Sequence, residues 1–111
     1  MSESGQDAGA LRAESAGLTP PGLFVVERRL PRINDHQLTV LQAALTSAAS
    51  RFSARGDGVR LVGSLFLARQ ERLLSLFTAE SLEAVRAVNE ASLVPFASIE
   101  PAVQLPGPEE S

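Results

Sequence analysis

Two residue types with distinctive chemistry are missing from this chain of 111 residues. There is no cysteine, which excludes disulfide bonds, thiolate metal ligands and cysteine nucleophiles. There is also no lysine, because arginine accounts for all 10 residues of the combined lysine and arginine count. Without a lysine amine the chain can form neither a Schiff base nor the lysine contact of a Walker phosphate loop.

Concentrated positive charge and long apolar runs are missing as well. The formal net charge is -3 and the arginines are spread from Arg12 to Arg86, whereas nucleic-acid binding needs positive charge gathered on one face. No apolar run approaches the roughly 18 residues that span a bilayer, and the first residues lack the apolar run of a signal peptide. We therefore expect a cytoplasmic protein without nucleic-acid, membrane or cofactor partners.

The composition of the two ends differs from that of the middle. Residues 1–21 are polar, small and glycine-rich, and residues 106–111 are similar. Such segments bury too little apolar surface to offset the entropy of ordering them, so both are predicted to be disordered tails. Residues 22–105 are predicted to form one domain.

The first half of that domain reads as a strand followed by a helix. Residues 23–30 begin with β-branched and apolar side chains and end before Pro31, which is typical of a strand. Asn34 is a suitable helix N-cap, and Gln37 three residues later completes a capping box. The helix that follows has an apolar stripe with steps of three and four residues, formed by Leu38, Leu41, Leu45, Ala48 and Phe52.

The second half reads as a hairpin, a helix and a last strand. Strands are predicted at residues 59–68 and 72–78, and their short connection makes them antiparallel. Four apolar residues of the first of these share one parity, and we expect them on one face: Val59, Leu61, Leu65 and Leu67. Ser81 caps the second helix, whose predicted inward face consists of Ala84, Val85, Val88 and Ala91. The last strand is predicted at residues 99–105.

The predicted fold class is α+β, with the ferredoxin-like βαββαβ order. Right-handed crossovers place the first and third strands in the centre of a four-stranded antiparallel sheet and put both helices on one face. Pro101 cannot donate to a sheet ladder, which suits the edge position that this topology gives to the last strand.

Three stretches of the chain resemble a known family. They are residues 24–31 (FVVERRLP), residues 33–38 and residues 82–89 (LEAVRAVN). They resemble a family of small bacterial ferredoxin-like proteins of unknown function that includes nickel-responsive members. The resemblance implies a homodimer formed through the side of the sheet opposite the helices and closed into a dimeric α/β barrel.

The metal-binding members of that family use histidines at the end of the first strand and in the second helix, with a cysteine on the third strand. This chain has Glu27 and Arg28 at the first place, Asn89 at the second and Ser75 at the third, so it departs from the metal pattern. His36 is the only histidine, and it falls in a first helical turn, where free N–H groups disfavour a cation. No metal site is therefore predicted, with His36 the sole candidate ligand.

No catalytic residues emerge from the sequence. Gly63-Ser64 comes nearest to a G-x-S-x-G nucleophile elbow but lacks the second glycine. The ligand-binding candidates are Glu27, Arg28 and Asn89, because charges on a central strand need partners. Glu27 and Arg28 should point to opposite faces, and either could line a site for a small polar ligand. The alternative for Glu27 is that the strand has already reached solvent there, or that an arginine such as Arg60 or Arg72 neutralises it.

Three functions remain open for the chain. The first is a non-catalytic module that dimerises or binds a partner, and it predicts an apolar sheet face covered in a symmetric dimer. The second is a small-ligand or metal-responsive binding protein with degenerate metal ligands, as the resemblance implies. The third is a cofactor-free enzyme of the dimeric α/β-barrel type, which rests on analogy of fold alone.

Overall fold

A computed structural model describes residues 22–56 and 58–108. The elements follow the order strand, helix, strand, strand, helix, strand. They are β1 (Gly22–Arg29), α2 (Asp35–Ala54), β2 (Arg60–Leu67), β3 (Arg72–Ala79), α3 (Leu82–Ala91) and β4 (Ser98–Ala102). The tail predicted at residues 1–21 lies outside the described residues, as do residues 109–111 of the C-terminal one.

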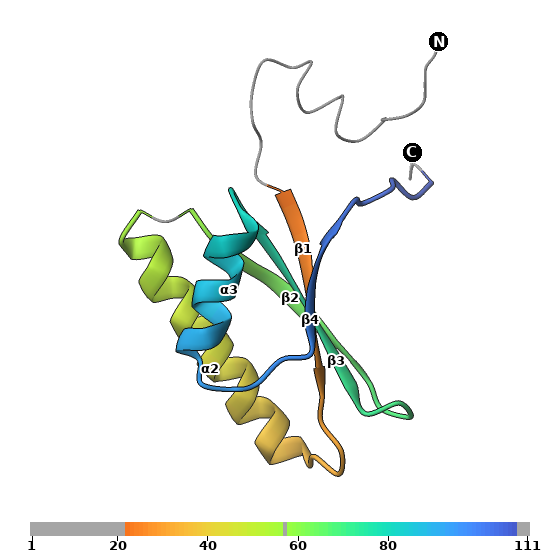
Figure 1. Ribbon diagram of the computed structural model, residues 1–111. Helices are drawn as coiled ribbons and strands as arrows, with labels where there is room; N and C mark the ends of the chain where they lie inside the picture. The colour runs from red at the N-terminus through yellow and green to blue at the C-terminus, as the bar shows by residue number, and fades with distance from the viewer. Residues whose placement is uncertain (1–21, 57, 109–111) are drawn as a thin grey trace.

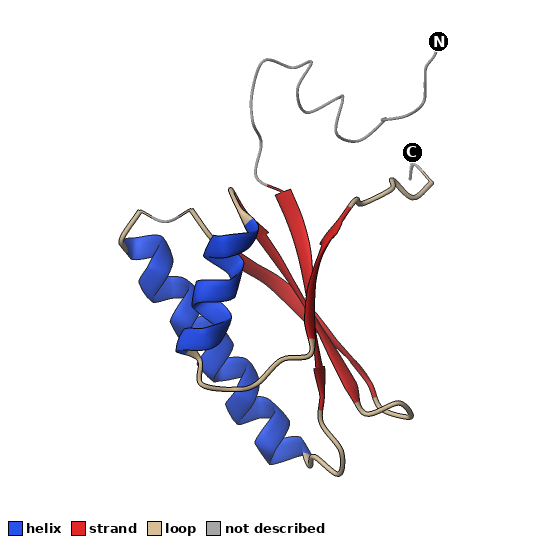
Figure 2. Cartoon of the chain, in the orientation of Figure 1, coloured by secondary structure: helices blue, strands red, loops and turns tan. Residues whose placement is uncertain are grey.

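The four strands form one antiparallel sheet in the order β2-β3-β1-β4. Both helices lie across the same side of this sheet (Figure 1), and the two-layer arrangement is clear when strands and helices are coloured apart (Figure 2). The predicted α+β class and ferredoxin-like order are therefore confirmed. Pro101 lies in β4, which pairs only with β1 at the edge of the sheet, as predicted.

The start of α2 has the predicted capping box. Asn34 Oδ1 accepts a hydrogen bond from the Gln37 backbone N–H at 2.7 Å, and the Gln37 side chain accepts one from the Asn34 N–H at 3.0 Å. Two backbone donors that the helix cannot satisfy itself are thus bonded. Leu41 and Leu45 of the predicted stripe are buried, which confirms the face that α2 turns to the sheet.

Buried side chains form two clusters between the sheet and the helices. The larger one includes Phe24, Val26, Ala48, Phe77, Val85 and Val88. The smaller one contains Leu41, Leu45 and Leu73. The β1 and β3 residues of both clusters alternate with residues on the opposite side of the sheet, so each strand gives every second side chain to this core.

The predicted face of β2 is wrong because the strand contains an irregularity. The register with β3 shifts between Leu61 and Gly63, which leaves Val62 without a paired residue. An extra residue reverses the parity of everything after it. Leu61 packs against the core, whereas Leu65 is 59% exposed and lies on the side without helices.

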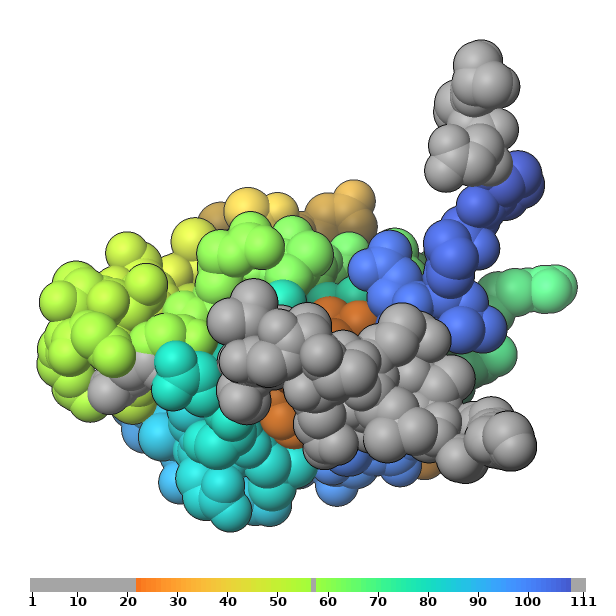
Figure 3. All heavy atoms as spheres, turned by 90° about the horizontal axis from the view of Figure 1, so that it is seen from above, coloured from red at the N-terminus to blue at the C-terminus, as the bar shows by residue number. Residues whose placement is uncertain are grey.

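Two other predictions at the end of the chain are also wrong. Ala91 is exposed, and Asn89 takes the buried position on α3 instead. β4 ends at Ala102 rather than at residue 105, and Val103 and Leu105 are exposed. Two views of the molecule show these last described residues leading away from the sheet (Figure 1 and Figure 3).

Candidate functional site

Glu27 and Arg28 point to opposite sides of the central strand β1. Side chains alternate along a strand, and the burial pattern of β1 follows that alternation. Arg28 lies on the helix side with Phe24 and Val26, whereas Glu27 lies on the side that no helix covers. The predicted opposite directions of Glu27 and Arg28 are therefore observed, and the two residues belong to two separate sites.

Arg28 is fully buried beneath α3 and the loop that follows it. Its Nη2 donates to Asn89 Oδ1 at 2.9 Å and to the backbone oxygen of Val94 at 3.2 Å. The guanidinium carbon lies 5.7 Å from the centre of the Phe96 ring. The structure thus brings two of the three candidate ligand-binding residues, Arg28 and Asn89, into direct contact.

Asn89 is positioned for this contact by its own helix. Its Nδ2 donates to the backbone oxygen of Val85, one turn earlier, at 2.8 Å. Because that bond uses the amide nitrogen, the amide oxygen is directed at Arg28. Asn89 is fully buried as well, so the pair forms a polar centre inside an otherwise apolar layer.

Two nitrogens of the Arg28 guanidinium have no hydrogen-bond partner among the described residues. Its Nε and Nη1 atoms are buried and make no hydrogen bond to any residue among 22–56 and 58–108. Both acceptors of Nη2 are neutral. Burial lowers the pKa of Arg28 to about 10, which leaves the side chain positively charged at neutral pH.

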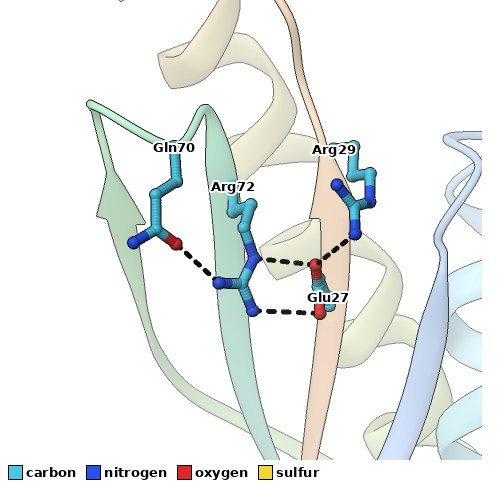
Figure 4. A network of polar contacts seen from close by, with 4 residues as sticks. All are labelled: Glu27, Arg29, Gln70 and Arg72. Carbon is cyan, nitrogen blue, oxygen red and sulfur yellow. Dashed lines mark hydrogen bonds and ion pairs between the residues drawn. The ribbon is translucent and has the colours of Figure 1, made fainter.

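Glu27, the third candidate, is bound by Arg72 of the neighbouring strand β3 (Figure 4). Arg72 Nε donates to Glu27 Oε2 at 2.8 Å and Arg72 Nη2 donates to Oε1 at 3.2 Å. Arg72 Nη1 donates to Gln70 Oε1, and Arg29 is a more distant ion-pair partner of Glu27 at 3.9 Å. The hydrogen bonds from Arg72 lower the pKa of Glu27, despite an opposing effect of burial.

The Glu27–Arg72 pair borders an apolar surface on the side of the sheet opposite the helices. Cross-strand partners share a face, and the register pairs Val25 with Leu76 and Leu65 with Leu74. We call this surface the open face; its apolar residues are Leu23, Val25, Leu65, Leu67, Leu74 and Leu76.

The residues at the remaining positions of the metal-binding pattern have other roles. Ser75 is buried and shares a 2.9 Å hydrogen bond with Ser64, which donates to Gln42 Oε1 at 2.8 Å. His36 is exposed in the first turn of α2. Within residues 22–56 and 58–108, no three His, Asp or Glu side chains gather into a possible metal site.

Sequence reasoning missed two parts of these sites. The sequence placed Leu65 and Leu67 on the same face as Leu61. The alternation of apolar residues does not show where a strand is irregular, and the only hint in the sequence was Gly63, next to the irregularity. The sequence also gave no role to Val94 and Phe96, which cover Arg28. The only local signal there was the Pro95 between them, which marks a break after α3.

Comparison of the chain with protein-family models, with curated proteins and with solved structures gave no match. The resemblance to the family with nickel-responsive members therefore stays a prediction. Among the described residues, no helix has both the length and the apolar character needed to cross a bilayer.

Proposed function

We propose that the protein is a cytoplasmic, non-catalytic module that forms a homodimer through its open face. Two sheets packed in this way would close into a dimeric α/β barrel with the helices outside. The observation that carries the proposal is the open face itself, where six branched apolar side chains of three adjacent strands lie on one surface without helices. A surface of this kind is typical of an interface.

The arrangement of charge favours a second copy of the same chain as the partner. The acidic residues of the open face, Glu27 and Glu100, lie on β1 and β4, whereas Arg60 and Arg72 lie on β2 and β3. A two-fold axis parallel to the strands places β1 and β4 of one copy over β3 and β2 of the other. Opposite charges then meet on both sides of the apolar centre, as an isologous interface requires.

Arg29 is the exception to this charge pattern. It lies at the end of β1 and its side chain is 72% exposed. A long side chain at a strand end can extend into solvent while its stem remains at the rim, so it does not oppose the pairing of the apolar centre.

Sedimentation equilibrium tests the proposal. The wild-type protein is expected to be a dimer at micromolar concentrations. Leu76→Arg places a charge in the middle of the open face, where a dimer would bury it, and should yield a monomer with an unchanged circular dichroism spectrum.

Val40→Arg is the matched control, because Val40 is 54% exposed on α2, on the other side of the molecule. This variant should remain a dimer. A wild-type protein that is monomeric at all concentrations, or a Leu76→Arg variant as dimeric as the control, would contradict the proposal.

A second candidate function is the binding of a small polar ligand at Arg28 and Asn89. One observation favours it, namely that two nitrogens of a fully buried guanidinium have no hydrogen-bond partner in the part of the chain that the structure describes. Native structures satisfy nearly all buried polar atoms, so unsatisfied N–H groups of a cation point to a missing partner. This site is on the helix side of the sheet and is independent of the dimer.

A further inference from the structure

Within residues 22–56 and 58–108, the buried positive charge of Arg28 has no carboxylate partner. Among the described residues, Arg28 bonds only to an amide oxygen and a backbone oxygen. The nearest acid along the chain, Glu27, is on the opposite face and bound to Arg72. A buried charge without a counterion is strongly unfavourable, whereas the same charge paired with an anion is tolerated.

The cover over Arg28 is the loop between α3 and β4, residues 92–97. Its Val94 oxygen accepts from Arg28, and its Phe96 ring lies beside the guanidinium. Leu93, between α3 and these two residues, has a φ of 63° and is 88% exposed. A branched residue in the left-handed region is strained, so movement of the loop would relieve strain at Leu93.

Movement of this loop would also change the donors that Arg28 presents. When the Val94 oxygen leaves, one N–H of Nη2 becomes free while the other remains on Asn89. That N–H then lies beside a free N–H of either Nε or Nη1, and the two form a parallel pair of donors. Such a pair matches two oxygens of a carboxylate or a phosphate group.

We infer that Arg28 and Asn89 form a binding site for an oxyanion, a phosphate or carboxylate group, which enters when residues 92–96 move aside. The inference rests on the second candidate function above and names its ligand class. Asn89 is a positioning residue in this site, because its oxygen fixes the guanidinium while the anion takes the remaining donors.

Thermal unfolding with sodium phosphate or sodium acetate, each compared with sodium chloride at equal ionic strength and pH 7, tests the site. The melting temperature of the wild-type protein should rise by about 5 °C when either oxyanion is well above its Kd. A rise with phosphate alone or with acetate alone would support the inference and identify which oxyanion the site takes. Arg86→Met, which removes an exposed arginine from α3, should respond like the wild type.

Two variants should lose the response by different routes. Arg28→Met removes the cation, and Asn89→Asp keeps the shape of the side chain while supplying a carboxylate as an internal counterion. Asn89→Asp should melt close to the wild-type temperature without added anion, because its ion pair with Arg28 offsets the lost hydrogen bond to the Val85 oxygen. It therefore also covers the case in which Arg28→Met does not fold. The response should persist in Leu76→Arg, which separates it from dimer formation.

Amide hydrogen exchange supplies a second readout, since phosphate should accelerate exchange at Leu93, Val94 and Phe96 of the wild type but not of Arg28→Met. The inference is overturned if neither oxyanion raises the melting temperature above that in chloride, or if a folded Arg28→Met retains the full rise. A rise with a neutral sugar but with neither oxyanion would overturn the oxyanion class and leave the second candidate function standing.

Discussion

At Glu27 and Arg28, neighbouring charged residues meet opposite environments because successive side chains of a strand point to opposite faces. Glu27 finds a bidentate partner in Arg72 across one strand pair and is still 18% exposed. Arg28 enters the apolar layer and finds only neutral acceptors. The same alternation thus creates a satisfied ion pair on one side and an incomplete polar site on the other.

The Glu27–Arg72 pair should make stability depend on pH. The pKa of Glu27 is lowered from its ordinary value of 4.5, so the folded state binds its proton less readily than the unfolded state. The stabilisation is therefore complete above about pH 4.5 and disappears as the pH falls through the lowered pKa. Glu27→Gln should melt below the wild type at pH 7, and the difference should shrink as the pH falls below 4.5 and through the lowered pKa.

Glu90→Gln is the control for this measurement, because Glu90 is exposed on α3. Its melting temperature should match that of the wild type throughout this pH range. If the difference between Glu27→Gln and the wild type stays constant as the pH falls from 7 to well below 4.5, the ion pair does not contribute as described.

At the scale of elements, α2 shows how local chemistry fixes a boundary. Asn34 and Gln37 satisfy each other's backbone donors at the helix start. At the other end the backbone N–H of Arg55 donates to the Phe52 oxygen at 3.1 Å, and that of Gly56, which has a φ of 87°, donates to the Ser53 oxygen at 3.0 Å. A left-handed residue at this place is the usual way for a helix to end.

Removing the cap should therefore cost stability that a substitute acceptor restores. Asn34→Ala deletes the oxygen that bonds the Gln37 N–H and should lower the free energy of unfolding by about 1 kcal/mol. Asn34→Ser retains an oxygen acceptor and should remain close to the wild type. Urea denaturation at one fixed protein concentration measures both variants.

Gln37→Ala provides a finer comparison, since it removes only the reciprocal bond to the Asn34 N–H. We expect a smaller loss of stability than for Asn34→Ala, because Gln37→Ala leaves the side-chain oxygen of the N-cap residue in place. Equal stability of Asn34→Ala and the wild type would show that the cap contributes nothing to this helix.

At the scale of the whole molecule, a sheet with helices on one side leaves its other side uncovered. The irregularity at Val62 turns Leu65 and Leu67 of β2 to that side, where they extend the apolar rows of β1 and β3. A single extra residue in an edge strand therefore enlarges the surface on which the proposed dimer depends.

The proposed two-fold axis predicts a specific rescue by paired charges. Glu100→Arg brings like charges together with Arg60 of the partner copy, and should weaken the dimer about 10-fold for two such contacts. Glu100→Arg combined with Arg60→Glu exchanges the two charges and should restore the wild-type dissociation constant. Sedimentation equilibrium at low salt measures all three proteins.

Comparison of the single and double variants tests the position of the two-fold axis separately from the existence of the dimer. Arg60 and Glu100 make no ion pair with any described residue, so their exchange should leave the protomer intact. If the double variant dissociates as readily as the single one, the dimer has another axis. High salt should reduce both the weakening caused by Glu100→Arg and its recovery in the double variant, since exposed charges are screened.

Most of the fold was predictable because its signals are local. The stripe of α2, its cap and the antiparallel hairpin each depend on residues within a few positions of one another, and the proline in β4 restricts that strand to an edge. Burial of one face of each element then leaves few topologies. The predicted end of the last strand and the predicted burial of Ala91 were wrong, because the periodic spacing of apolar residues does not show where strand pairing or helix packing stops.

Local patterns along the chain are enough to predict the elements and their order, and the alternation of side chains along a strand is enough to predict the opposite directions of Glu27 and Arg28. Packing is what brings Arg28 to Asn89, 61 positions away, brings Arg72 to Glu27, and turns Leu65 out of the core. These outcomes depend on the register of one strand against another and on which loop covers which strand. No local pattern contains that information, because the contacts join residues that become neighbours only when the sheet and helices pack.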